Sequence, residues 1–189
     1  MSAVAIPAWT ASGVLPPIRS ADSLSAERSP YAVSLTDCVL RFSDTRERRA
    51  VLDGYLRHRA ALHAAGLVTG FQWLDGSFLE HVEQTEGRAP NDLDVVTFYR
   101  LPVGTSQAQL AARLGPLARR DEGTRRYRVD GYLVHLGMAP ERLARQSAYW
   151  YGVWSHRRSG LWKGFVEVDL SPTDDAIAGA MLLTRGASE

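Results

Sequence analysis

Trp73-Leu74-Asp75-Gly76-Ser77 and Pro90-Asn91-Asp92-Leu93-Asp94-Val95-Val96-Thr97-Phe98 are the two most informative stretches of this chain. In each stretch, apolar and aromatic residues typical of β-strands adjoin a short polar segment. Side chains alternate between the two faces of a strand, so Asp92 and Asp94 are expected to point to the same side. The two stretches therefore predict a strand, a Gly-Ser turn and a second strand that begins with two carboxylates.

The spacing of Asp92 and Asp94 suits a pair of metal ions. Two residues along a strand span about 6.6 Å at ~3.3 Å per residue. Carboxylates at that separation can share two Mg²⁺ ions roughly 3.5–4 Å apart, the geometry of two-metal phosphoryl chemistry. Gly76 leaves backbone room for a phosphate, and Ser77 adds a hydroxyl, whereas Asp75 is interpreted as a turn residue. The alternatives are a solvated strand start and an ordinary tight turn.

The remaining chain alternates between helical and strand patterns. Apolar residues at helical spacing predict helices over residues 44–65, 106–119 and 141–154, with a short helix after Ser171-Pro172. Apolar, β-branched and aromatic runs predict strands over residues 71–74, 93–99, 126–136 and 164–170. Residues 31–42 fit either a short strand or a loop. The expected fold class is α/β (α+β), with a small mixed sheet flanked by helices.

Length and composition place the chain among ordinary globular proteins. A chain of 189 residues predicts one domain, over residues 31–189, after an Ala-, Ser- and Pro-rich extended arm over residues 1–30. The net charge of +1 provides no global field that would attract nucleic acid or an anionic membrane. A single cysteine, Cys38, excludes an internal disulfide and a cysteine-rich zinc site. Without a transmembrane-length apolar run or a signal peptide, a cytoplasmic protein with no membrane partner is expected.

Two further clusters suggest ligand contacts. The basic residues His156-Arg157-Arg158 and Lys163 suit a triphosphate tail or an RNA acceptor, because arginine binds phosphate in a bidentate manner and lysine supplies a point charge. The alternative for these residues is a solvated hairpin. An aromatic group at helical spacing is interpreted as core packing, with base stacking as the alternative: Tyr149, Trp150, Tyr151 and Trp154.

Four segments together resemble the polymerase-β-like nucleotidyltransferase superfamily, and within it a family of small bacterial nucleotidyltransferase-like proteins. They are Gly13-Val14-Leu15-Pro16-Pro17, the Trp-x-Asp-Gly-Ser-Phe run, the Pro-Asn-Asp-x-Asp-Val-Val run and Lys163-Gly164. The resemblance covers residues 5–172. It implies a polymerase-β-like nucleotidyltransferase core that moves a nucleoside monophosphate from an NTP to a hydroxyl of a protein, a tRNA end or a small molecule. The implied cofactor is Mg²⁺ (or Mn²⁺).

The superfamily usually adds a third carboxylate from a later strand. Asp130 lies in a largely apolar strand, where a buried charge needs a partner such as a metal ion. Its alternative is a strand-end aspartate paired with Arg128. Glu167 and Asp169 compete for the role, although they fit the polar face of an edge strand. Asp130 is therefore expected to complete the site and to draw the proton from the acceptor.

The resemblance thus implies a specific set of site residues. Asp92, Asp94 and Asp130 are expected to be catalytic and to bind metal, and the expected nucleotide-binding residues are Gly76, Ser77, Arg157, Arg158 and Lys163. Some small members of the superfamily act in toxin–antitoxin or phage-defence pairs, so a cognate protein partner is also expected. Because fold does not fix function, a catalytically inactive antitoxin or interaction module on the same fold is the alternative.

Overall fold

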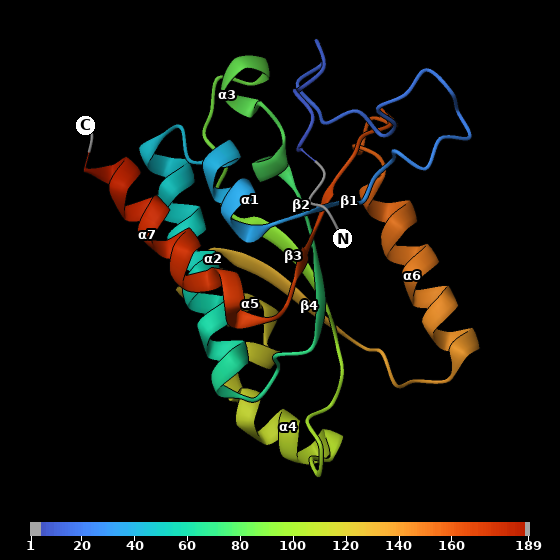
Figure 1. Ribbon diagram of the computed structural model, residues 1–189, viewed down its shortest axis with the longest axis vertical. Coiled ribbons are helices and arrows are strands. Elements are labelled where there is room, and N and C mark those ends of the chain that lie inside the picture. Colours follow the sequence, from blue (N-terminus) through green and yellow to red (C-terminus); the bar gives the residue numbers. More distant parts are fainter. Residues whose placement is uncertain (1–4, 188–189) are drawn as a thin grey trace.

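The computed structural model describes residues 5–187, without the side chains of residues 116, 118 and 120, and contains a five-stranded mixed sheet with helices on both faces (Figure 1). The strands are β1 Tyr31–Val33, β2 Gly70–Asp75, β3 Leu93–Tyr99, β4 Val129–His135 and β5 Val166–Asp169. Their order is β1-β5-β2-β3-β4, with β2 antiparallel to both neighbours and the two outer pairs parallel. This arrangement confirms the predicted mixed α/β class with a small sheet flanked by helices.

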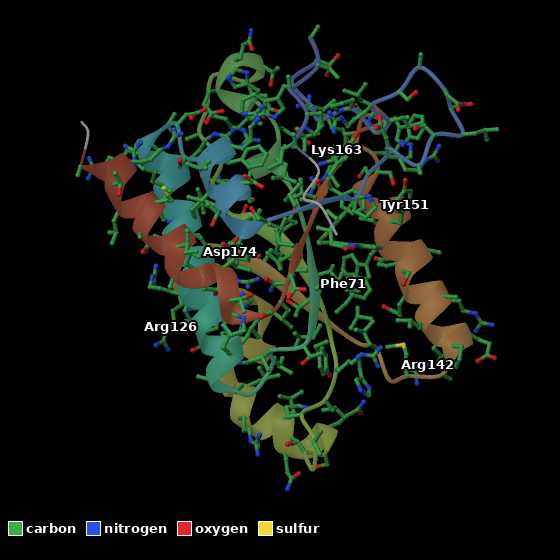
Figure 2. The ribbon with its side chains drawn as sticks, viewed as in Figure 1. Phe71, Arg126, Arg142, Tyr151, Lys163 and Asp174 are labelled. Carbon is green, nitrogen blue, oxygen red and sulfur yellow. The ribbon has the colours of Figure 1, made fainter. Side chains whose placement is uncertain are left out.

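The helices divide between the two faces of the sheet. One face is covered by α1 Leu35–Phe42, α2 Arg46–Ala64, α5 Arg120–Tyr127 and α7 Asp175–Gly186, and the other by α6 Pro140–Trp154 (Figure 1). Short helices occupy the connections: η1 Ser77–Leu79, α3 Val82–Thr85, α4 Gln107–Leu114, η2 Gly115–Ala118 and η3 Pro172–Asp174. Figure 2 shows Phe71 on the α6 side of the sheet and Asp174 on the α7 side. None of the described helices combines the length and apolar character needed to cross a membrane.

Local signals explain two elements that the sequence patterns did not resolve. Residues 31–42 contain both β1 and α1, because the Ser34 side chain accepts a hydrogen bond from the Asp37 N–H and so caps a new helix. The predicted strand start at residue 126 is wrong, since Arg126 and Tyr127 close helix α5. Arg128 then adopts the left-handed conformation, with φ 54°, and ends the helix one residue before β4.

Residues 5–30 form turns and irregular structure against the domain. Val14 and Leu15 of this segment are buried, and the Trp9 indole N–H donates to the Leu79 carbonyl at 2.7 Å. The first four residues of the predicted arm, and residues 188–189 of the predicted domain, lie outside the described residues.

A buried polar network fixes α2 and α7 to the sheet. Arg59 of α2 is fully buried and binds Asp175 at the start of α7 at 2.7 Å. Its second guanidinium nitrogen donates to Gln72 Oε1 of β2 at 2.7 Å, which also accepts from the Tyr55 hydroxyl. Gln72 in turn donates to Thr97 of β3 at 2.9 Å, its partner in strand register. The network satisfies polar groups that would otherwise be costly to bury.

Candidate active site

Strand register brings carboxylates from three strands together at one end of the sheet. Asp94 of β3 lies directly opposite Asp75 of β2 on one side and opposite Asp130 of β4 on the other. Residues that face each other across neighbouring strands project from the same face of the sheet. Asp92 precedes β3 by one residue, and its charge also acts on Asp94. The structure therefore brings together the three predicted carboxylates and adds Asp75 to them.

The electrostatics of the cluster disfavour a full set of negative charges. The pKa of Asp94 is raised to about 7, first by burial and then by the charges of Asp75, Asp130 and Asp92. The ammonium group of Lys163 offsets only part of this effect. Like charges at close range disfavour ionisation, and a bound cation removes that penalty. The cluster is therefore arranged to gain stability from a positive ligand.

Gly76 lets the backbone of the turn pass against the Asp94 carboxylate. Its φ of 85° and ψ of −172° are a conformation that only glycine adopts without strain. A Cβ at this position would lie 2.7 Å from Asp94 Oδ2. Ser77 follows as the first residue of η1, beside the same cleft. The Gly-Ser turn therefore lies in direct contact with the carboxylate cluster.

A buried arginine holds the segment after this turn. Arg48 of α2 is only 1% exposed, and its guanidinium donates to the carbonyls of Phe78 and Glu80, both at 2.6 Å. It also binds Glu83 at 2.6 Å. Sequence reasoning missed Arg48, because a lone arginine in a charged helix carries no signal that its partners lie 30 residues or more away.

Lys163 and Asp75 form the buried ionic floor of the site. The Lys163 ammonium lies 2.8 Å from Asp75 Oδ1 and 2.9 Å from Glu80 Oε1, at the end of the sheet seen in Figure 2. Burial alone would lower the pKa of Lys163, but Asp75 and Glu80 outweigh it and raise the pKa. Burial raises the pKa of Asp75 to about 6 despite the attraction of Lys163. Attraction outweighs burial for the pKa of Lys163 but not for that of Asp75. Lys163 faces two carboxylates, whereas Asp75 faces one ammonium group and is repelled by Glu80.

Arg157 extends the ionic network to the rim. Its Nη2 atom lies 2.6 Å from Glu80 Oε2, yet neither Nη2 nor Nε has a hydrogen-bond partner among the described residues. The ion pair is close, but its N–H groups are not directed at the carboxylate. Arg158, the next residue, is exposed and also lines the cleft. The rim therefore carries two arginines, Arg157 paired with Glu80 and Arg158 exposed.

These residues line a cleft of about 930 Å³ between the sheet and α6. Every predicted site residue except Asp92 lines it, and it also contains the following side chains: Asp75, Glu80, Glu86, Arg88, Tyr132, Tyr149, Trp150, Val153, Trp154, His156 and Ser159. A smaller pocket of about 410 Å³, on the side of α2, α4 and α5, contains none of the predicted residues. The large cleft is therefore the candidate active site.

The competing carboxylates of β5 lie outside this cleft. Glu167 is opposite Trp73 in register and accepts a hydrogen bond from its indole N–H at 2.8 Å. Asp169 accepts from the Ser171 N–H at 2.6 Å. The geometry thus places Asp130, and neither β5 carboxylate, beside Asp94.

The oxygen donors of the cluster fit Mg²⁺ or Mn²⁺. Within the described part of the chain, no three His, Cys, Asp or Glu side chains form a ready group around a metal position. Magnesium is usually bound through only one or two carboxylates, with waters and substrate phosphates completing its coordination. Asp94 and Asp130, on adjacent strands beside an open glycine turn, match that demand.

Comparison with known proteins gives one match. Neither the curated proteins nor the solved structures contain a match to this chain. A family model, described as a family of unknown function, matches residues 7–169 and thus most of the chain, including the sheet, the carboxylate cluster and Lys163. The chain therefore belongs to the family of unknown function DUF6932.

Proposed function

We propose that this protein is a cytoplasmic, metal-dependent nucleotidyltransferase with a polymerase-β-like core, which moves a nucleoside monophosphate from an NTP to an acceptor hydroxyl. The observation that carries the proposal is the register that sets Asp94 opposite Asp130 while the Gly76 backbone lies against the Asp94 carboxylate. Phosphoryl transfer needs little covalent help from the protein. It depends on positioning and on charge stabilisation, which metal ions held by this cluster would supply.

Each part of the cleft takes one task in the proposed reaction. Asp92, Asp94 and Asp130 would hold Mg²⁺ (or Mn²⁺), which when bound neutralises the triphosphate and aligns the attacking and leaving oxygens. Asp130 accepts the proton of the acceptor hydroxyl. The acceptor oxygen bonds to the α-phosphorus, the bond from that phosphorus to the bridging oxygen breaks, and pyrophosphate leaves. The Gly76 turn and the Ser77 hydroxyl contact the phosphates.

The basic residues divide into rim and floor. Arg157 and Arg158 line the cleft at its rim, from which they would approach the triphosphate tail, and Arg158 is exposed there. Lys163 lies at the floor, where its charge offsets those of Asp75 and Glu80. Its charge therefore limits the total negative charge that the phosphates meet. The acceptor is a protein, a tRNA end or a small molecule.

An inactive interaction module, such as an antitoxin, is the second candidate. The observation that favours it is the state of Lys163, whose ammonium is already bound by Asp75 and Glu80 before any phosphate arrives. In that case the cleft is an active site that has lost its activity. The function is then binding to a cognate protein in a toxin–antitoxin or phage-defence pair. Under this alternative, the carboxylate cluster contributes nothing to activity in the cell.

Transfer of label separates the two candidates. The protein is incubated with each α-³²P-labelled NTP, Mg²⁺ or Mn²⁺ and cell extract, and labelled products are resolved. Asp94→Asn and Asp130→Asn should each lower labelling by at least ~10²-fold, about 2.7 kcal/mol of transition-state stabilisation. Glu167→Gln is the matched control, a carboxylate of the same sheet outside the cleft, and should stay within about twofold of wild type. Equal labelling by Asp94→Asn and wild type, or no labelling with any NTP, would contradict the proposal.

A further inference from the structure

We propose that helix α6 carries the nucleobase subsite of the cleft, where the base of the NTP stacks on Tyr149 beside Trp150. This inference rests on the proposed function, because the base can bind at this end of the cleft only if the phosphates bind at the other end. The acceptor would then enter from the remaining open side of the cleft.

The cleft has two chemically different walls. The carboxylates, the Gly-Ser turn and the basic residues form a charged wall that suits phosphates and metal. The other wall is aromatic and apolar, and comprises Tyr132 of β4 with Tyr149, Trp150, Val153 and Trp154 of α6. A nucleoside triphosphate has the same division, with charge at one end and a flat aromatic base at the other.

Core packing does not explain the whole aromatic group of α6. Trp154 is 5% exposed and packs against Phe165, so it does belong to the core. Tyr149 is 58% exposed, and among the described residues its ring contacts only that of Trp150, at 5.2 Å between centroids. Val153, one helical turn further on, is 48% exposed and lines the same cleft. The core interpretation of the sequence thus holds for Trp154 and fails for Tyr149.

A continuous set of contacts joins the carboxylates to Tyr149. The Tyr132 hydroxyl donates to Asp130 Oδ2 at 3.3 Å, and the Tyr132 ring lies 4.4 Å from the ring of Trp150. Tyr149 in turn packs against Trp150 edge to face, at an interplanar angle of 76°. The aromatic wall therefore begins at the catalytic carboxylates and leads away from them, as the sugar and base lead away from the α-phosphate.

Trp150 supports the ring of Tyr149 and does not itself present a polar group to the cleft. Its indole N–H is buried and has no hydrogen-bond partner among the described residues, and an atom shielded from solvent in this way is not available to a ligand. The aromatic surface open to a base is therefore the exposed ring of Tyr149. Stacking itself tolerates any base, because every base presents a π-face.

Titration of ligand fragments tests the assignment. Binding of Mg²⁺–ATP, Mg²⁺–CTP and Mg²⁺–tripolyphosphate is measured by calorimetry for wild type and for Tyr149→Ala. Loss of one stacking partner should weaken ATP and CTP about tenfold and leave tripolyphosphate unchanged. Two matched controls should bind all three within about twofold of wild type: Tyr149→Phe, which keeps the ring, and Trp162→Ala, which removes an exposed tryptophan outside the cleft lining. Because Tyr149 is exposed, its variants should fold, and circular dichroism checks this.

The outcomes separate the two proposals. Unchanged nucleotide affinity in Tyr149→Ala, with wild type still binding NTP, overturns the base subsite and leaves the proposed function standing. An equal loss of nucleotide and tripolyphosphate also overturns it, because Tyr149 would then act on the phosphates. Loss of label transfer with full NTP affinity overturns it as well, since α6 would then bind the acceptor. Absence of NTP binding in wild type overturns the proposed function and this inference together.

Discussion

Buried charged groups have opposite surroundings on the two faces of the sheet. On the α2 and α7 face, Arg59 is surrounded by acceptors, namely Asp175, Gln72 and the carbonyls of Asp169 and Ser171. On the α6 face, Asp94 is surrounded by carboxylates of neighbouring strands, and its pKa is raised accordingly. Hydrogen-bonded opposite charges stabilise the fold, whereas a cluster of like charges costs stability until a cation arrives. The α6 face is therefore the one that would gain stability from a bound cation.

Lys163 differs from the carboxylates around it, because its charge is matched by hydrogen-bonded partners. It belongs to the cleft face, yet with Asp75 and Glu80 it forms a buried ionic group like that of Arg59. The cleft face therefore combines a structural ionic group with a carboxylate pair, Asp94 and Asp130, of which Asp94 lies opposite Asp75 in the sheet register. Variants on the two faces should fall into separate classes, one losing stability and the other losing activity.

The largest expected effect is on the structural face. Arg59→Met should lower the free energy of unfolding by about 3–5 kcal/mol, because it leaves Asp175 and Gln72 without their buried partner. Arg57→Met removes an exposed pair with Asp53 on the same helix and should cost less than about 1 kcal/mol. Urea unfolding measures both variants. If they lost similar amounts, the Arg59 network would not be the structural element described here.

The free energy of unfolding should also depend on pH, by about 3 kcal/mol, through a histidine on the same face. His58 of α2 is 4% exposed, and burial, followed by the charge of Arg59, lowers its pKa from 6.5 to about 4. The unfolded chain binds a proton below pH 6.5, but the folded protein does so only near pH 4. Stability from this group is thus complete above pH 6.5 and is lost as the pH falls toward 4, by about 1.36 kcal/mol per unit.

Replacement of His58 isolates this contribution. His58→Leu removes the titrating group but keeps an apolar side chain, so the gap in stability between wild type and variant should narrow or reverse as the pH falls from 7 to 4.5. Chemical denaturation at a series of pH values measures it. A gap that stays constant across this range would show that His58 titrates normally.

A smaller effect on stability is expected at the turn of the cleft face. Gly76→Ala should cost about 1–3 kcal/mol, because its φ of 85° is strained for alanine, and the added Cβ would meet Asp94. Gly87→Ala is the matched control: its φ is also positive, at 63°, but no atom lies near the added Cβ. Only Gly76→Ala should also abolish label transfer. Comparable activity in the two variants would remove the Gly76 turn from the mechanism.

Local patterns in the sequence were sufficient for most of the fold. The alternation around Asp94 and the helical spacing along α2 are local, so the sheet and main helices followed from them. Helix α5 was missed, because its charged sequence has no clear apolar stripe and its end depends on the left-handed backbone of Arg128. The cap at Ser34 that separates β1 from α1 was likewise missed, because the residues of this short segment also fit a single strand or a loop.

The site was less predictable, because its contacts are distant in sequence. Asp94 and Asp130 were predicted, and the register sets them side by side. Asp75 was interpreted as a turn residue, since its ion pair with Lys163 spans 88 positions and leaves no local trace. For the same reason, the sequence placed Lys163 with the phosphate-binding residues, and the carboxylates that neutralise it could not be foreseen.

Thermal unfolding of Asp94→Asn tests whether the carboxylate cluster binds a nucleotide together with metal. Without metal, the variant should be at least as stable as wild type, because it removes a charge that burial and neighbouring carboxylates disfavour. Mg²⁺ with NTP at about 100 times its dissociation constant should stabilise wild type by about 2.7 kcal/mol and leave the variant unshifted. A metal-free Asp94→Asn protein that is clearly less stable than wild type, yet still shows the full shift with Mg²⁺ and NTP, would contradict the account.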